Sequence, residues 1–257
     1  MSEAIDQGHV ESSIDAHGIA TIEFGHPLSN SLPGKILQKL ANTIETLGKS
    51  ADVKVIVLTS EGERVFCAGA SFDELISIKE LETGKIFFSG FANVINACRK
   101  CPKFIIGRVQ GKAVGGGVGV ASAVDYCFAT KFADVKLSEL AVGIGPFVVG
   151  PAVERKMGKS AMTQLAINAT EWRSALWAQE NGLYAEIFEN IEEMDERIFE
   201  LATRLSKSNP EAMSILKQVF WQGTENWDTL LAERAAMSGE LVLSDFTVNA
   251  INVFKKK

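Results

Sequence analysis

Short apolar runs typical of buried strands alternate with amphipathic helical stretches along most of this chain. Residues 53–59 and 104–109 are apolar and suited to strands, and residues 87–98 between them have helical periodicity. Residues 10–24 alternate in polarity around His17-Gly18, which predicts a hairpin. Parallel strands need crossover connections, usually helices. The order of the segments therefore predicts an α/β fold with a largely parallel sheet.

The same patterns predict further elements. A helix begins near Pro33, with Asn30 or Ser31 as its N-cap and apolar residues at helical spacing behind it. The remaining segments are read in the same way, with strands expected at 126–129, 135–137 and 185–188, and helices at 150–157, 160–168 and 174–181.

From residue 194 onward the pattern is helical throughout, and Pro210 is placed to start a helix. We therefore divide the chain into a core, residues 1–193, and a helical C-terminal region, residues 194–257. Four large aromatic residues give this region more aromatic surface than a small helical tail needs: Trp221, Trp227, Phe246 and Phe254. This surplus predicts that the region packs on a neighbouring subunit.

Composition narrows the classes of function. The chain has 257 residues, 46% of them hydrophobic, and a net charge of −6, with no basic block before the terminal lysines. This balance argues against a nucleic-acid or membrane-surface partner. No signal peptide or run of about 20 apolar residues is visible, so a cytoplasmic location is expected. Cys98 and Cys101 form one C-x-x-C pair without nearby histidines, which favours burial over a metal site.

A glycine-dense stretch, residues 111–122, contains Gly115, Gly116 and Gly117 and then small apolar residues that suit a short helix. The first turn of such a helix presents free N–H groups that favour negative charge, either a phosphate or an oxyanion formed during a reaction. Close packing of two helices is the structural alternative. Neither the P-loop ending nor the Gly-x-Gly-x-x-Gly dinucleotide pattern is present, so no nucleotide cofactor is indicated.

Four motifs occur in a familiar order: Phe-Cys-Ala-Gly-Ala at 66–70, the glycine motif at 111–117, an alanine four residues before Asp125, and Ser-Glu-Leu-Ala-Val-Gly-Ile at 138–144. In order and spacing they resemble the crotonase superfamily of enoyl-CoA hydratases and isomerases, known from fatty-acid β-oxidation. The resemblance implies a spiral of ββα repeats followed by a helical trimerisation region, with trimers that often pair as hexamers. It also implies an acyl-CoA thioester substrate and no prosthetic group.

The resemblance assigns roles to particular residues. The backbone amides of Ala70 and Gly116 correspond to the two donors that hold the thioester oxygen, and the carbonyl of Ala68 corresponds to a contact with the CoA adenine. Glu139 corresponds to one catalytic glutamate and is expected in an apolar pocket that raises its pKa. The family's other glutamate is replaced here by Gly119. Asp73 and Glu74 are candidates to replace that missing acid.

These assignments leave more than one reaction open. Hydration of a 2-enoyl-CoA is favoured because the stretch at 138–149 is similar to methylglutaconyl-CoA hydratases. A single base suffices to move a double bond, so isomerisation of a 3-enoyl-CoA is the first alternative. A non-catalytic acyl-CoA-binding protein is the second. The three histidines, His9, His17 and His26, all precede the first predicted helix, so histidine chemistry is not expected.

Overall fold

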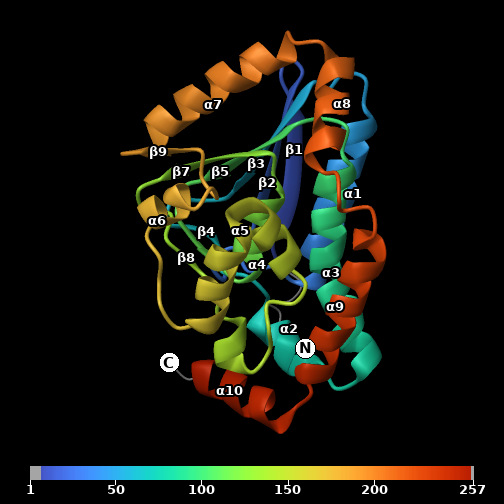
Figure 1. The fold of residues 1–257 in the computed structure, drawn as a ribbon, viewed down its shortest axis with the longest axis vertical. Helices are drawn as coiled ribbons and strands as arrows, with labels where there is room; N and C mark the ends of the chain where they lie inside the picture. Colours follow the sequence, from blue (N-terminus) through green and yellow to red (C-terminus); the bar gives the residue numbers. More distant parts are fainter. Residues whose placement is uncertain (1–6, 256–257) are drawn as a thin grey trace.

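The computed structural model describes residues 7–255, and it contains two sheets surrounded by helices (Figure 1). The larger sheet has the strand order β1-β2-β3-β5-β7-β9, and the smaller has the order β4-β6-β8. Only β1 and β2 pair antiparallel, as the predicted hairpin requires, and the other strand pairs are parallel. The large sheet consists of β1 (His9–Ile14), β2 (Ile19–Gly25), β3 (Val55–Ser60), β5 (Ile105–Val109), β7 (Tyr126–Thr130) and β9 (Glu186–Phe188). The predicted parallel α/β fold is confirmed.

A ββα unit repeats along the core. In each unit the first strand joins the large sheet, the second joins the small sheet, and a helix follows. The small sheet consists of β4 (Val65–Cys67), β6 (Lys112–Val114) and β8 (Val135–Lys136). The helices that follow these strands are α2 (Phe72–Ser77) with α3 (Leu81–Lys100), α4 (Gly116–Ala123), and the 3-10 helix η2 (Glu139–Val142) with α5 (Gly150–Ile167). The chain therefore forms the spiral that the resemblance implied.

Both faces of the large sheet are covered, which explains why its inner strands are apolar without alternation. Every residue of β3 is buried. On one face, α1 (Gly34–Lys49) and α3 contribute to the main hydrophobic core. On the other, Met194, Ile198 and Ala202 of α7 (Ile191–Ser206) form a smaller core with apolar residues of the strands. Figure 1 shows α7 lying across the upper part of the sheet.

The C-terminal helices pack closely on the core. They are α8 (Pro210–Phe220), α9 (Trp227–Leu241) and α10 (Asp245–Lys255), and the short α6 (Ala175–Glu180) precedes β9. Helix α9 crosses α3 where Gly84 faces Gly239, since a Cβ on Gly84 would lie 3.0 Å from the Cα of Gly239. The two backbones therefore approach each other without intervening side chains. None of the helices within 7–255 is both long and apolar enough to cross a membrane.

The predicted N-cap of the first long helix is wrong. Helix α1 begins at Gly34 with Pro33 as its N-cap, and Asn30 lies in the left-handed region at φ 55°. The Asn30 side chain donates instead to the carbonyl oxygens of Glu61 at 2.7 Å and Val65 at 2.9 Å. A capping residue must be free to accept from the first helical amides. The side chain of Asn30 instead binds the loop that contains Glu61 and Val65, and its local sequence does not predict this contact.

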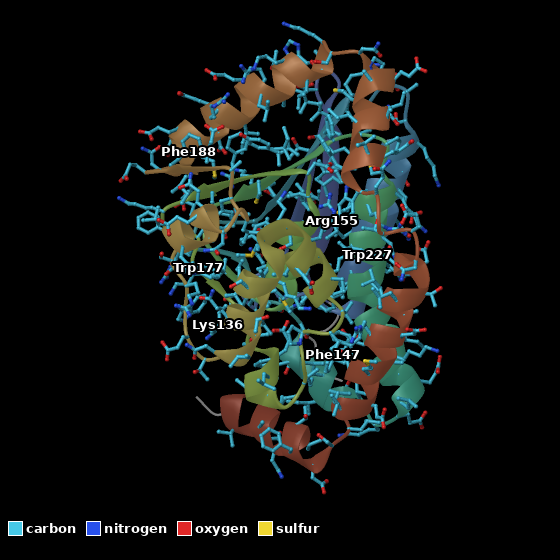
Figure 2. All side chains as sticks on the ribbon, in the orientation of Figure 1. Lys136, Phe147, Arg155, Trp177, Phe188 and Trp227 are labelled. Atoms are coloured by element: carbon cyan, nitrogen blue, oxygen red, sulfur yellow. The ribbon has the colours of Figure 1, made fainter. Side chains whose placement is uncertain are left out.

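The prediction that Trp221 and Trp227 supply an interface surface is also wrong, because both are buried within the subunit. Their rings meet edge to face at a centroid distance of 5.8 Å, and the guanidinium carbon of Arg155 lies 3.7 Å from the Trp221 ring centroid. Figure 2 labels Arg155 on α5 and Trp227 at the start of α9. Phe246 is 68% exposed, as an interface residue would be in the isolated subunit. The side chain of Phe254 lies outside the described residues.

The four cysteines are buried free thiols. Cys98 lies in α3 and Cys101 caps its C-terminal end, which agrees with the expected burial of the C-x-x-C pair. Burial raises the pKa of the Cys98 thiol to about 12, so it is an uncharged core residue at neutral pH.

Candidate active site

The loop after β4 brings Ala70 close to the glycine turn. Gly69 has φ 88°, and a Cβ at this position would lie 2.8 Å from the Val114 carbonyl oxygen and 3.3 Å from the Gly116 nitrogen. Both the left-handed backbone and the lack of space require glycine here. The Gly69 carbonyl accepts from the Leu32 amide at 2.7 Å, which fixes the loop. The loop is therefore held against the turn that precedes α4.

The turn itself presents free amide groups. Gly115 has φ 53° and ψ −117°, and α4 begins at Gly116. Among residues 7–255 neither the Gly116 amide nor the Ala70 amide donates a hydrogen bond. The first amides of a helix lack partners within the helix, and the helix dipole adds positive potential there. Two amides from different ββα units are thus available to one acceptor.

Glu139, the first residue of η2, lies beside this turn. A Cβ on Gly115 would be 3.1 Å from Glu139 Oε1, so a side chain at that position would crowd the carboxyl group. The residue is half-buried as a whole, but its Oε2 atom is buried and has no hydrogen-bond partner in the described part of the chain. Burial raises the pKa of Glu139 to about 7, and a hydrogen bond from its own backbone opposes the shift. The carboxyl group can therefore gain or lose a proton near neutral pH.

Ala70, Gly116 and Glu139 line one cavity of about 40 Å³. Its remaining lining residues are mostly apolar: Phe88, Phe91, Gly145, Pro146, Phe147, Val148, Val149 and Ser238. The predicted apolar surroundings of Glu139 are present, although they come from α3 and the loop before α5. Leu140, its neighbour in the sequence, is 52% exposed. None of the three histidines or Ala68 is among these lining residues.

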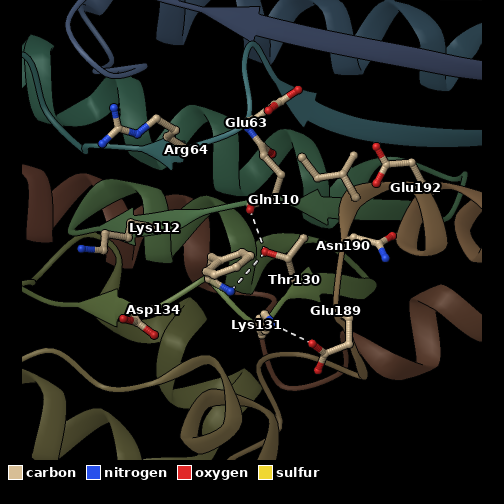
Figure 3. Close-up of a pocket in the computed structure, with 12 residues that line it drawn as sticks. Glu63, Arg64, Gln110, Lys112, Thr130, Lys131, Asp134, Glu189, Asn190 and Glu192 are labelled. Atoms are coloured by element: carbon tan, nitrogen blue, oxygen red, sulfur yellow. Dashed lines mark hydrogen bonds and ion pairs between the residues drawn. The ribbon is translucent and has the colours of Figure 1, made fainter.

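A larger cavity of about 550 Å³ lies elsewhere and contains none of these groups (Figure 3). Its walls carry both signs of charge, including Arg64, Glu63 and Asp134, and Lys131 is paired with Glu189. The Thr130 hydroxyl donates to the Gln110 carbonyl at 2.7 Å. Its acidic residues Glu63, Glu189 and Glu192 are exposed, and neither Ala70, Gly116 nor Glu139 lines it, so the small cavity is the better candidate for catalysis despite its size.

A family model described as enoyl-CoA hydratase/isomerase matches residues 15–248. The chain belongs to this family. It is accordingly an enzyme of the lyase or isomerase type that these family members represent.

Individual relatives support the same assignment. A probable enoyl-CoA hydratase of Bacillus subtilis is 27% identical over 93% of both chains. The mitochondrial methylglutaconyl-CoA hydratase of Mus musculus is 28% identical over 89% of this chain and 74% of its own. The crystal structure of an enoyl-CoA hydratase from Bacillus halodurans superposes with a TM-score of 0.87 at 19% identity, covering 95% of this chain and 99% of that one. This last likeness shows the crotonase-type fold.

The position of the first family glutamate is closed in this member. A Cβ on Gly119 would lie 2.6 Å from the Cβ of Val149. The space into which a side chain at 119 would extend is therefore filled by Val149, which itself lines the cavity. This site therefore differs from a two-carboxylate site, because residue 119 is glycine and the Val149 side chain fills the space beside it.

Neither candidate replacement for the missing acid lines the cavity. Glu74 Oε2 accepts from the Gly34 amide at 2.7 Å and so serves the N-terminus of α1. Burial raises the pKa of Glu74 also, while the hydrogen bond from Gly34 opposes that shift. Asp73 lies beside it on α2, and the lining residues include neither. Glu139 is therefore the only carboxyl group among the lining residues of this cavity.

Sequence reasoning missed the aromatic wall of the cavity, which consists of Phe88, Phe91 and Phe147, and the contribution of α9. Phe91 lies against Gly116, where a Cβ would come 2.7 Å from the Phe91 Cζ atom. Phe147 covers Gly145, and Ser238 reaches the cavity from the C-terminal region. Gly239, the residue after Ser238, was the one sign in the sequence that α9 contributes to the site, because a glycine within a helix indicates close packing. Nothing in the sequence pairs it with Gly84.

Proposed function

We propose that this enzyme hydrates a 2-enoyl-CoA thioester and that Glu139 is the only carboxylate that takes part in the catalysis. The observation that carries the proposal is that two free backbone amides and one carboxyl group with a buried, unpaired oxygen line a single cavity. The amides of Ala70 and Gly116 bind the thioester oxygen and stabilise the enolate that forms when a nucleophile adds to C3. Removal of one such donor typically costs about 3 to 4 kcal/mol in the transition state.

Glu139 carries the proton in this reaction. As carboxylate it removes a proton from water while the water oxygen bonds to C3, and the thioester oxygen takes up the negative charge. The protonated Glu139 then donates this proton to C2 as the enolate collapses, so that H and OH are added and Glu139 is regenerated. A pKa near 7 suits a group that acts as base and then as acid.

The CoA moiety is substrate and not a prosthetic group, and the Ala68 carbonyl contacts its adenine. Residues 1–193 bind and activate the thioester, and residues 194–257 mediate assembly into a trimer or hexamer. Support for assembly comes from exposed apolar residues of α8 and α10, namely Ile215, Leu216, Val219, Phe220, Phe246, Val248 and Val253. Light scattering after size exclusion measures the assembly directly.

The alternative is isomerisation of a 3-enoyl-CoA, and the single carboxylate favours it specifically. One base can remove a proton at C2 and return it at C4 without water. The deciding experiment follows purified enzyme with crotonyl-CoA and with a 3-enoyl-CoA in heavy water, using NMR to detect products. Formation of 3-hydroxyacyl-CoA supports hydration, and a shifted double bond without water addition supports isomerisation. If the protein binds both acyl-CoA thioesters but converts neither of them, the binding-protein alternative is favoured.

The aromatic wall leads to a prediction about acyl-chain length. A cavity of about 40 Å³ suits a short acyl group, and Phe147, one of its lining residues, lies in the loop before α5 (Figure 2). Phe147→Ala is expected to raise kcat/KM for an eight-carbon enoyl-CoA relative to crotonyl-CoA by about tenfold or more, the range that methylene discrimination spans. Phe132→Ala is the matched control, because Phe132 is exposed in the other cavity. An unchanged ratio in Phe147→Ala would mean that another residue limits chain length.

A further inference from the structure

Ser238 is the second polar side chain of the cavity that contains Glu139. It lies on α9, is 2% exposed, and is one of the cavity's lining residues. The other lining residues are glycine, alanine, proline, valine or phenylalanine, apart from Glu139. A substrate or water in this cavity can therefore form side-chain hydrogen bonds only with Glu139 and Ser238.

The close helix crossing explains how Ser238 reaches the site. Its neighbour Gly239 lies against Gly84 and Lys85 of α3, where a Cβ on Gly239 would be 2.7 Å from the Lys85 nitrogen. Phe88 and Phe91, two of the three aromatic residues in the wall, lie further along the same helix α3. The absence of side chains at the crossing lets α9 approach α3, and Ser238 thereby lines the same cavity as Phe88 and Phe91.

Glu139 Oε2 is a buried oxygen without a hydrogen-bond partner among the described residues, and Ser238, whose hydroxyl group forms no hydrogen bond with another described residue, lines the same cavity. Buried polar groups are normally paired, so an unpaired carboxyl oxygen on the wall of a cavity indicates that a polar ligand binds there. The cavity volume of about 40 Å³ exceeds the roughly 10–15 Å³ that a single water needs. Val149 fills the space at Gly119, so no second acid competes for this role.

We propose that Ser238 binds the water that adds to C3 and orients it together with Glu139. Glu139 accepts the proton that the water loses, and the Ser238 oxygen accepts the water's other O–H as a hydrogen bond. With both hydrogens held, the oxygen lone pair points toward C3. Ser238 neither gains nor loses a proton over the reaction. This inference rests on the proposed hydration and names the group that replaces a second carboxylate.

The test separates water addition from proton transfer in one variant. Ser238→Ala is expected to lower kcat for crotonyl-CoA hydration by about tenfold, the effect of losing one orienting hydrogen bond, with KM changed less than about twofold. Butyryl-CoA has no double bond to hydrate, so exchange of its C2 protons in heavy water reports Glu139 and the two amides alone. This exchange should keep its wild-type rate in Ser238→Ala.

Ser122→Ala is the matched control, since Ser122 is also buried in a helix, has an unpaired hydroxyl and lies outside the cavity lining. It should leave both rates unchanged. Full hydration activity in Ser238→Ala would overturn the inference while leaving the proposed function intact. Equal losses of hydration and exchange would also overturn it, because they would indicate a general disturbance of the site. A wild type that binds crotonyl-CoA without hydrating it would remove the proposed function and this inference together.

Discussion

Glu139→Gln is expected to lower turnover by about 10² to 10⁴, the range that general acid–base catalysis supplies. Glutamine keeps the size and hydrogen-bonding capacity of the side chain but cannot carry a proton. The two backbone amides remain, so affinity for a saturated acyl-CoA should hardly change. Steady-state kinetics on crotonyl-CoA and titration calorimetry with butyryl-CoA measure the two quantities separately.

Glu74→Gln is the matched control for this variant. Glu74 is also a partly buried glutamate with a raised pKa, but it binds the Gly34 amide and lies outside the cavity lining. Its replacement should change turnover little. If Glu139→Gln keeps wild-type turnover, the catalytic assignment fails. If Glu74→Gln loses turnover to the same extent, the acid at 74 acts in the reaction.

The pH dependence provides a second measurement of the same carboxyl group. With a pKa of about 7, Glu139 is mostly protonated at pH 6, so kcat/KM should rise with pH through about 7. The folded-state pKa lies above the ordinary value of 4.5, so the folded state binds more protons between these values and Glu139 reduces stability as pH rises through them. Glu139→Gln should therefore be more stable than the wild type at pH 8 while being far less active. A less stable variant at pH 8 would contradict this.

Lys217→Met is expected to destabilise the protein by about 3 to 5 kcal/mol, because it leaves a buried charge uncompensated. Lys217 is 2% exposed, and its Nζ lies 2.7 Å from Asp125 Oδ2 and 2.8 Å from the Lys103 carbonyl oxygen. Asp125 also accepts from the Ile105 amide at 2.8 Å and from Trp221 Nε1 at 3.2 Å. This network joins α8 to the end of α4 and to β5. Urea denaturation at fixed protein concentration measures the change.

Lys131→Met is the matched control, since Lys131 and Glu189 form an exposed ion pair. The same substitution there should cost less than about 1 kcal/mol. The double variant Asp125→Asn with Lys217→Met should recover part of the loss, because both charges are removed together. If Lys217→Met and Lys131→Met destabilise the protein equally, the buried ion pair contributes no more to the free energy of unfolding than the exposed pair does.

Much of the fold could be predicted from the chain because its signals are local. The inner strands are continuously apolar since both sheet faces are covered, and the hairpin follows from alternation around His17-Gly18. The break predicted between two helices near residue 158 occurs inside α5, where Gly158 has φ 80°. The proximity of Ala70 and Gly116 could also be anticipated, since both belong to glycine motifs whose spacing matches a family. Backbone geometry leaves such marks in the sequence because only glycine tolerates it.

The surroundings of these groups were decided by tertiary structure alone. Glu139 acquires its raised pKa beside Phe91 and Phe147, which lie on segments its local sequence does not identify. Val149 fills the space beside Gly119, and Ser238 arrives from the C-terminal region through a glycine crossing. Trp221 is a core residue, because its indole N–H donates to Asp125 and its ring packs against the guanidinium group of Arg155. Each of these contacts joins residues far apart in the chain. Close side-chain packing between two distant segments produces no periodic pattern in the sequence of either segment, so the sequence does not show which segments are in contact.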